Sequence, residues 1–379
     1  FLLLVLGTVA FLGMDVMMRG AIELGADSTA GLLSKCVGRW SMPVMDFLLV
    51  VYGNGAAIAY FIFLGDFLPS LAIDLNYLAG MPPLEVSPQV LRTHCILATL
   101  ILVVPLSTPP KLSALRFASP VALVAILFTA ITVLCKCPLL FASHVGKDGF
   151  GEVQWFILNW DFFKAFSVLL FAYNCHLNVV PVTSELTDPS DNRIERVCFR
   201  VVLVEISFYA LIATGGYLSF LALTTQNILQ SYGSSPSVLM CRAGLSFTIL
   251  IAIPTNNLPT IRSLQGLITS LVPSKSQKPG MEPLLSAGLS EGSNVLRLLL
   301  TAICLAAQVS TAIAVPNVAD VMGLLGASVG TVLMMALPLA VLLKVQPKSY
   351  SAARFWFTAS LLSTGMMVAF SAIVVMLQP

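Results

Sequence analysis

Polar side chains interrupt one of the long apolar segments of this chain near its middle. They are Asn174, Cys175, His176 and Asn178, and Pro181 follows them. An unpaired polar group in hydrocarbon costs several kcal/mol, so such a break persists only where it lines a cavity or packs against protein. Amide, thiol and imidazole groups, together with backbone groups freed at a helix end, can bind the carboxylate and ammonium of a zwitterion. The segment therefore predicts a ligand site within a membrane.

The sequence allows two interpretations of His176. Its reference pKa of about 6.5 would allow the ring to titrate and to carry a coupling proton. A neutral imidazole could instead donate a hydrogen bond to a backbone carbonyl that Pro181 leaves without its usual donor. Both interpretations stay open on the sequence alone. Broken helices of this kind form the binding sites of secondary transporters.

The composition identifies a membrane protein with many spans. Of its 379 residues, 57% are hydrophobic and 10% are charged, whereas a soluble domain has about 25% charged residues. The net charge of +2 gives no indication of nucleic-acid binding. Nothing in the sequence identifies a protein partner, so the expected partners are a small substrate and the lipid bilayer.

Ten apolar segments are long enough to cross a bilayer, which takes about 20 residues. We expect these spans at residues 1–18, 44–73, 91–107, 117–135, 162–183, 200–223, 243–264, 296–315, 318–343 and 355–377. With the loop after the first span in the cytosol, 15 Lys and Arg residues lie in cytosolic loops and 5 on the other side. This bias predicts the orientation by the positive-inside rule. The loop at 136–161 is then outward, with Trp155 and Trp160 as interface anchors, and the cytosolic loop at 273–295 is expected to be disordered.

The second span contains further candidate ligands. Tyr60 and Asn54 lie among small residues that permit close helix packing. Either side chain could face a binding site, and Asn54 could instead only bridge two helices. Glu205 lies one turn inside its span, where it could reach water, pair with Arg200 or take part in ion coupling.

Metal and enzyme chemistry are not expected. The eight cysteines are scattered, and the one close pair, Cys135 and Cys137, lacks the spacing of a metal site. The three histidines are His94, His144 and His176, and the first two fall in or beside outward loops. An intramembrane enzyme would need a nucleophile with a base, or metal ligands, at mid-depth. We therefore expect no catalytic residues, no metal and no cofactor other than a coupling ion, H⁺ or Na⁺.

Four motifs together resemble the amino acid/auxin permease family, in the branch of sodium-coupled neutral and vacuolar amino acid transporters. The most specific match consists of Cys175, His176, Pro181, Ser184, Glu185, Leu186, Asp188, Pro189 and Ser190. The segment from Tyr60 through Gly65 and Asp66 to Pro69 resembles the family's third span. A third match consists of Pro105, Leu106, Ser107, Leu112, Leu115, Arg116 and Ser119, and a fourth of Val315, Pro316, Asn317, Gly323 and Gly326. The matches fall in order over nearly the whole chain.

The resemblance implies a leucine-transporter-like architecture, in which two inverted repeats surround a midplane site made by two broken helices. Residues 1–135 would be the remainder of the first repeat, 162–343 the second repeat, and 355–377 a final span, so that about ten helices of an expected eleven are present. The first broken helix would then precede Phe1, as in a fragment or incomplete gene model, although a ten-span variant is the alternative.

The sodium-coupled members of the family carry two hydroxyl residues before a proline in the span that corresponds to 243–264. Aligned on Pro254, those positions are Leu250 and Ala252 here. Sodium prefers hydroxyl and carbonyl oxygens, so this departure favours proton coupling. The nearby hydroxyls remain candidates for ion coupling, as does His176. They are Ser246, Thr248 and Thr255.

The sequence thus predicts a secondary active transporter for amino acids in the plasma membrane or a vacuolar or lysosomal membrane. Neutral substrates are expected from the resemblance and from the lack of an acidic or basic residue near Asn174 in the same span. Two alternatives stay open. One is an amino-acid sensor of the same fold that binds without transporting, and the other is a truncated, inactive fragment.

Overall fold

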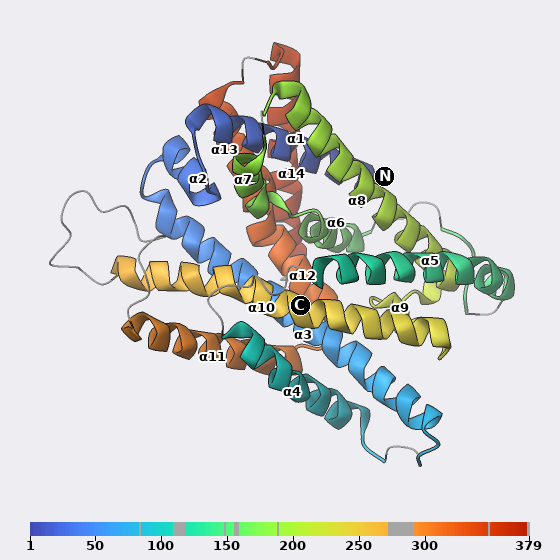
Figure 1. Ribbon diagram of the computed structural model, residues 1–379. Helices are drawn as coiled ribbons and strands as arrows, with labels where there is room; N and C mark the ends of the chain where they lie inside the picture. Colours follow the sequence, from blue (N-terminus) through green and yellow to red (C-terminus); the bar gives the residue numbers. More distant parts are fainter. Residues whose placement is uncertain are drawn as a thin grey trace. The chain divides into compact units, whose positions relative to one another are not determined.

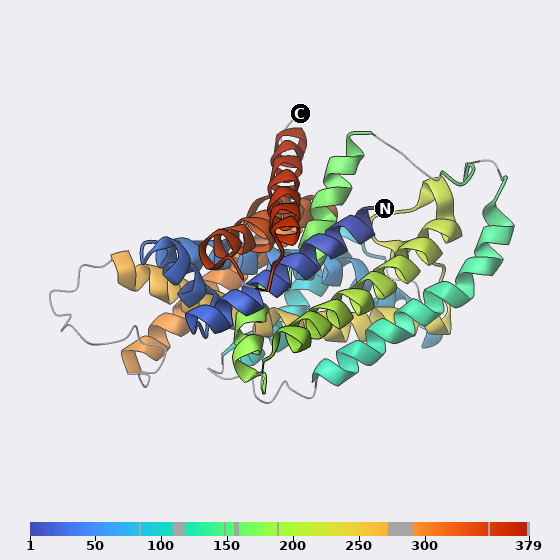
Figure 2. The same ribbon diagram turned by 90° about the horizontal axis from the view of Figure 1, so that it is seen from above.

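The computed structural model describes residues 1–82, 85–108, 118–147, 149–154, 159–187, 189–271, 291–347 and 349–376. The described chain consists of helices joined by loops (Figures 1 and 2). Ten helices or helix pairs in this part of the chain are long and apolar enough to cross a membrane. They coincide with the ten predicted segments, which confirms an all-α polytopic membrane protein.

Two compact units alternate along the chain, and each is considered by itself. The first unit comprises Phe1–Met42, Leu123–Arg242 and Asn317–Pro379, and the second comprises Pro43–Ala122 and Ala243–Pro316. These units are not the two repeats implied by the resemblance. The division into a first repeat at 1–135 and a second repeat at 162–343 stays a prediction.

Two membrane spans of the first unit are interrupted: Asp161–Glu185 between α6 and α7, and Val318–Val345 by π-helical turns. The helices of this unit follow in chain order. They are α1 (Leu2–Leu24), α2 (Thr29–Val37), most of α5 (Ala118–His144), α6 (Asp161–Ala172), α7 (His176–Glu185), α8 (Asp191–Phe220), the short turns η2 (Leu221–Leu223) and α9 (Ile228–Ser231), α12 (Val318–Leu325), the π-helical turns η3 (Gly326–Gly330) and η4 (Val332–Ala336), α13 (Leu337–Val345) and α14 (Ala352–Met376). The second unit holds α3 (Ser41–Leu78, from Pro43), α4 (Pro88–Ser107), most of α10 (Pro236–Leu271) and α11 (Glu291–Ala314).

Several helices extend beyond the predicted spans because hydropathy detects only their apolar part. The helix α8 begins at Asp191, nine residues before the predicted start at 200, and its first turns are mostly polar. The helix α5 continues through Lys136 and Pro138 to His144. Parts of the sequence interpretation fall outside the described residues, namely Leu112, Leu115, Arg116, Trp155, Asp188 and most of the loop at 273–295.

Local sequence explains several helix ends in the first unit. Gly25 adopts a left-handed conformation (φ 61°) and closes α1 with its N–H directed at the Ala21 and Ile22 carbonyls, a conformation that glycine adopts at little cost. Asn317 begins α12, where its Oδ1 accepts hydrogen bonds from the N–H groups of Ala319 (3.0 Å) and Asp320 (3.4 Å). Such a cap satisfies N–H groups that have no partner within the helix. The Asn317 of the fourth motif therefore has a structural role.

The core of the first unit forms around α1. Buried apolar side chains of α1, such as Leu6, Met14 and Met17, pack in one cluster with Leu170 of α6 and Val341 of α13. Because α1 packs against α6, α7, α8 and α13, its buried polar side chains, Asp15 and Arg19, meet other protein groups rather than lipid. This position of α1 brings it against the predicted break.

Candidate functional site

The predicted break is present between α6 and α7 (Figure 1). The helix α6 ends at Ala172, α7 begins at His176, and Tyr173, Asn174 and Cys175 form the gap. The Cys175 side chain does not cap α7. The start of α7 therefore presents N–H groups beside these three residues. At the end of α6, the Leu169, Phe171 and Ala172 carbonyls already accept hydrogen bonds from the Tyr173 N–H, the Asn174 N–H and the Tyr209 hydroxyl. A carboxylate suits the N-terminal end of α7 and an ammonium suits the C-terminal end of α6.

Pro181 frees a carbonyl in α7, but His176 does not satisfy it. Proline lacks the N–H that would bond four residues back, at Leu177. The Thr29 hydroxyl donates a hydrogen bond to the Leu177 carbonyl at 3.0 Å instead, from the first turn of α2. This contact leaves the His176 ring available for another role. The structural interpretation of His176 as the partner of a carbonyl opened by Pro181 is therefore wrong.

The His176 ring is completely buried against α1. Gly13 makes room for it, since a Cβ at Gly13 would lie 2.7 Å from His176 Nε2 and 3.1 Å from the Met334 carbonyl oxygen. The ring lies near the Ala10 backbone, but neither ring nitrogen makes a hydrogen bond of normal geometry to a described residue. Buried imidazole nitrogens are normally paired. His176 therefore has unused hydrogen-bonding capacity at the start of α7.

Asn174 in the gap also has buried side-chain atoms without hydrogen-bond partners among the described residues. They are its Oδ1 and its Nδ2. Gly330, at the end of the π-helical turn η3, faces it, because a Cβ there would lie 3.6 Å from Asn174 Nδ2. π-Helical turns within α-helices are frequent at functional sites. Asn174 and His176 together offer one amide acceptor, one amide donor group and an imidazole to a ligand.

The other two residues predicted for this site are placed differently. The Cys175 thiol contacts the Met14 thioether, with 3.4 Å between the sulfur atoms, so it packs against α1. Asn178 lies on an exposed face of α7. The contacts thus favour Asn174 and His176 as ligands, whereas binding roles for Cys175 and Asn178 stay predictions.

Glu205 of α8 lies close to the break. The next turn of α8 carries Tyr209, whose hydroxyl donates to the Ala172 carbonyl at the end of α6 (2.9 Å). The Tyr209 ring packs edge-on against Tyr173, with 5.2 Å between centroids. Glu205 is within electrostatic range of Tyr173, Cys175 and Tyr209, and its buried Oε2 has no described hydrogen-bond partner. The span that contains Asn174 carries no charged residue near it, as the sequence predicted, but the neighbouring helix α8 carries Glu205.

Asn54, in the second unit, belongs to a cluster of amide side chains. Gln308 Nε2 of α11 donates to Asn54 Oδ1 (2.8 Å) and to Asn257 Oδ1 of α10 (2.9 Å). Asn54 Nδ2 donates to the Val50 carbonyl of its own helix (2.8 Å). The Asn54 amide thus bridges α3 and α11, the alternative left open by the sequence, and Gln308 extends the cluster to α10. Its role as a substrate ligand stays a prediction.

The remaining candidates of the second unit do not converge on one ion. Thr248 and Thr255 each donate to a carbonyl four residues back, in both cases at 2.8 Å. They are seven residues apart, about 10 Å along α10, and the Ser246 hydroxyl is buried without a described partner. Tyr60 is partly buried within α3. A single Na⁺ could not contact all three hydroxyls, so each remains a separate prediction.

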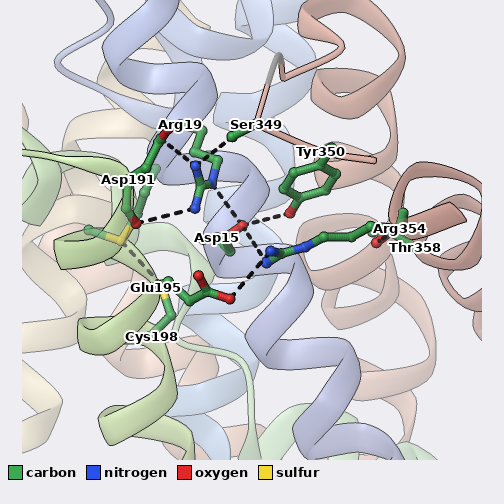
Figure 3. Close-up of polar contacts among 10 residues, drawn as sticks. Asp15, Arg19, Asp191, Glu195, Cys198, Ser349, Tyr350, Arg354 and Thr358 are labelled. Atoms are coloured by element: carbon green, nitrogen blue, oxygen red, sulfur yellow. Dashed lines mark hydrogen bonds and ion pairs between the residues drawn. The ribbon is translucent and has the colours of Figure 1, made fainter. Parts of the chain in front are cut away.

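A polar network that the sequence interpretation missed lies in the first unit (Figure 3). Completely buried Asp15 of α1 accepts hydrogen bonds at Oδ2 from Arg19 Nε (2.9 Å), the Tyr350 hydroxyl (2.6 Å) and Arg354 Nη2 (3.3 Å). Arg19 also pairs with Asp191 and donates to Ser349 Oγ (2.7 Å), and Arg354 pairs with Glu195 (3.3 Å). The network ties α1 to the start of α8 and to the segment that leads into α14.

Tyr350 holds the two cations of this network beside its ring. The Arg354 guanidinium carbon lies 4.4 Å from the ring centroid and that of Arg19 lies 5.7 Å away. Burial and the adjacent Asp15 carboxylate raise the pKa of Tyr350, so its hydroxyl remains a donor at physiological pH. The spacing of Asp15 and Arg19, four residues apart in an apolar helix, was the sequence signal for this network.

Metal binding finds no support within the part of the chain that the structure describes. No group of three or more His, Cys, Asp or Glu side chains there lies close enough together to hold a metal ion.

Comparison with known proteins finds a family and several relatives that this chain resembles in sequence. Residues 1–378 match the family described as "Transmembrane amino acid transporter protein". The chain is 32% identical to the "Putative amino acid transporter AAT1" of Toxoplasma gondii over 70% of its length, which covers 35% of that protein. It is 27% identical to "Vacuolar amino acid transporter 5" of Schizosaccharomyces pombe (55% of the chain, 47% of the relative). It is 25% identical to "Sodium-coupled neutral amino acid transporter 7" of Xenopus laevis (76% and 61%).

The chain thus spans less than two thirds of the length of each of these relatives. The family match, by contrast, covers nearly every residue of the chain. The ten apolar helices make it an integral membrane protein. It belongs to the transmembrane amino acid transporter family.

Proposed function

We propose that this protein is a secondary active transporter that moves amino acids across a membrane by alternating access. Family membership and the names of the relatives support this function. The observation that carries the proposal is the gap between α6 and α7, where Asn174 and His176 leave four buried side-chain atoms without described partners. A buried polar group without a partner costs about 1–3 kcal/mol. A ligand that satisfies these atoms would recover that free energy.

Asn174 and His176 would form one part of the substrate site. The start of α7 suits the α-carboxylate, and the end of α6 suits the α-ammonium. The gap itself carries no charged side chain, which supports a preference for neutral amino acids. Participation of Cys175 and Asn178 in this site is a weaker proposal, as is participation of Asn54 and Tyr60.

Coupling to H⁺ or Na⁺ would drive accumulation. We favour the proton, because Leu250 and Ala252 occupy the positions where the sodium-coupled relatives carry hydroxyls. Ser246, whose hydroxyl is buried without a described partner, is the best Na⁺ candidate in α10 if sodium is the ion. We propose the plasma membrane or a vacuolar or lysosomal membrane as the location, supported by the name of the fission-yeast relative.

The test is uptake by proteoliposomes that contain the intact protein. Radiolabelled alanine or glutamine is supplied under an inward H⁺ gradient, an inward Na⁺ gradient or neither, with unlabelled arginine and glutamate as competitors. We expect accumulation under the H⁺ gradient and weak competition by the charged amino acids. Saturable binding without uptake under any gradient would refute transport and favour a sensor. Effective competition by arginine or glutamate would refute neutral specificity.

A further inference from the structure

Glu205 is an acidic side chain that the family-based function leaves unexplained. It lies within a candidate membrane span, Asp191–Leu223, on the face of α8 that also carries Tyr209. Tyr209 is hydrogen-bonded to the last residue of α6. Since residues four apart lie on one helix face, Glu205 points to the same side as Tyr209, towards the break.

The surroundings of Glu205 provide no positive charge among the described residues. The structure shows no ion pair for it there, and Arg200 of the same helix lies exposed without a described contact to it. The titratable groups that face it are Tyr173 and Cys175 of the gap and Tyr209 of α8. The helix packed against this part of α8 is α1, where residues 2–14 include no ionisable side chain.

These surroundings suit a carboxylic acid better than a carboxylate. An ionised side chain in a membrane span is costly unless it has a counter-charge or water. An uncharged carboxylic acid tolerates the apolar face of α1, and it gives up its proton when water or a cation reaches it. Acidic side chains within membrane spans form the proton relays of many pumps and transporters.

We propose that Glu205 binds the coupling proton, an inference that rests on the proposed transport function. The carboxylate takes the proton from water on one side of the membrane and returns it to water on the other side. The proton is held while the gap is closed to water. Because Glu205 is within electrostatic range of Cys175, its protonation state acts on the same segment that carries Asn174 and His176.

The substitution Glu205→Gln tests this role, since it keeps the size of the side chain but cannot bind and release the proton. Two measurements are made on the intact protein in proteoliposomes. One is accumulation of labelled alanine under an inward proton gradient, and the other is exchange of labelled for unlabelled alanine at equal pH. The variant is expected to lose at least tenfold in accumulation and to lose its pH dependence, while exchange persists. Glu205→Asp is expected to recover part of the accumulation.

The matched control is Glu23→Gln, the same change at an exposed residue at the end of α1. It should accumulate alanine like the wild type. Equal accumulation and equal pH dependence in wild type and Glu205→Gln would overturn the assignment while leaving transport intact. Accumulation that follows Na⁺ and ignores pH would also overturn it. Failure of the wild type both to exchange and to accumulate would refute the proposed function itself.

A second measurement does not depend on the folding of a variant. Dicyclohexylcarbodiimide modifies protonated carboxyl groups in apolar surroundings, and mass spectrometry locates the modified residue. In wild-type protein we expect modification of Glu205 at neutral pH that declines as the pH rises, and none at exposed Glu23. Lack of modification at Glu205, or modification that does not change with pH, would contradict the proposal.

Discussion

Replacing Asp15 by Asn removes the negative charge from the centre of the polar network while keeping the size of the side chain. Asp15 Oδ2 accepts from Arg19, Tyr350 and Arg354, and the side chain has no exposure. The Tyr350 hydroxyl can still donate to the amide oxygen of Asn. The two guanidinium groups lose their shared counter-charge.

The expected cost follows from the burial of Arg19. Its side chain is 5% exposed, so the cation cannot turn to water when the carboxylate is removed. Removing one partner of a buried ion pair costs about 3–5 kcal/mol. Arg19 keeps its pair with Asp191 and its bond to Ser349, and Arg354, 28% exposed, keeps Glu195. We therefore expect the lower end of this range, about 3 kcal/mol.

Thermal unfolding of the detergent-solubilised protein, followed by size-exclusion chromatography after heating, measures this loss. For a chain of 379 residues, a cost of about 3 kcal/mol corresponds to a fall of about 4 °C in Tm. The matched control is Asp191→Asn, which changes another carboxylate partner of the same Arg19. Asp191 is 63% exposed, and an exposed ion pair contributes about 0–1 kcal/mol. A Tm of Asp15→Asn equal to wild type, or a larger fall for Asp191→Asn, would refute the argument.

Two further substitutions test the close packing of the first unit and the amide cluster of the second unit. In Gly326→Ala, the new Cβ would overlap the Ser167 carbonyl oxygen and lie 2.9 Å from the Phe171 backbone nitrogen, so α6 must move and the folded yield in detergent should fall severalfold. Gly233→Ala is the control, because no atom lies within 4 Å of its new Cβ. A normal yield and Tm for Gly326→Ala would contradict the close approach of the two helices. Gln308→Leu removes the amide donor shared by Asn54 Oδ1 and Asn257 Oδ1 and should lower the free energy of unfolding by about 1–3 kcal/mol. The same change at exposed Gln89 should leave it unchanged. Equal Tm values for the two variants would show that the amide cluster does not stabilise the second unit.

The fold could be predicted from the sequence because hydropathy sums over about 20 residues and tolerates local errors. The break at Asn174 was visible because polar groups and a proline fall within one apolar span. The helix extensions of α8 and α5 were not predicted, because polar helical turns outside the membrane carry no hydropathy signal. Their ends depend instead on caps and on contacts with other helices.

The partners of the candidate site could not be predicted, because they come from distant parts of the chain. Thr29 satisfies the Leu177 carbonyl across 148 residues, and this contact removes that carbonyl as the expected partner of His176. Glu205 is 29 positions from His176 in the sequence, yet it is within electrostatic range of Cys175. Pairings of this kind depend on helix packing, for which a single sequence gives no register.

The most direct test of the central claim is whether an amino acid binds at the break and depends on His176. Equilibrium binding and proteoliposome uptake of radiolabelled alanine are measured for the intact wild type, for His176→Ala and for His94→Ala, which makes the same change at an exposed residue of α4. A hydrogen bond to a charged ligand group contributes about 1.5–3 kcal/mol, so His176→Ala should weaken binding and uptake at least tenfold with normal membrane insertion. His94→Ala should match the wild type. Unchanged binding and uptake in His176→Ala would contradict the account.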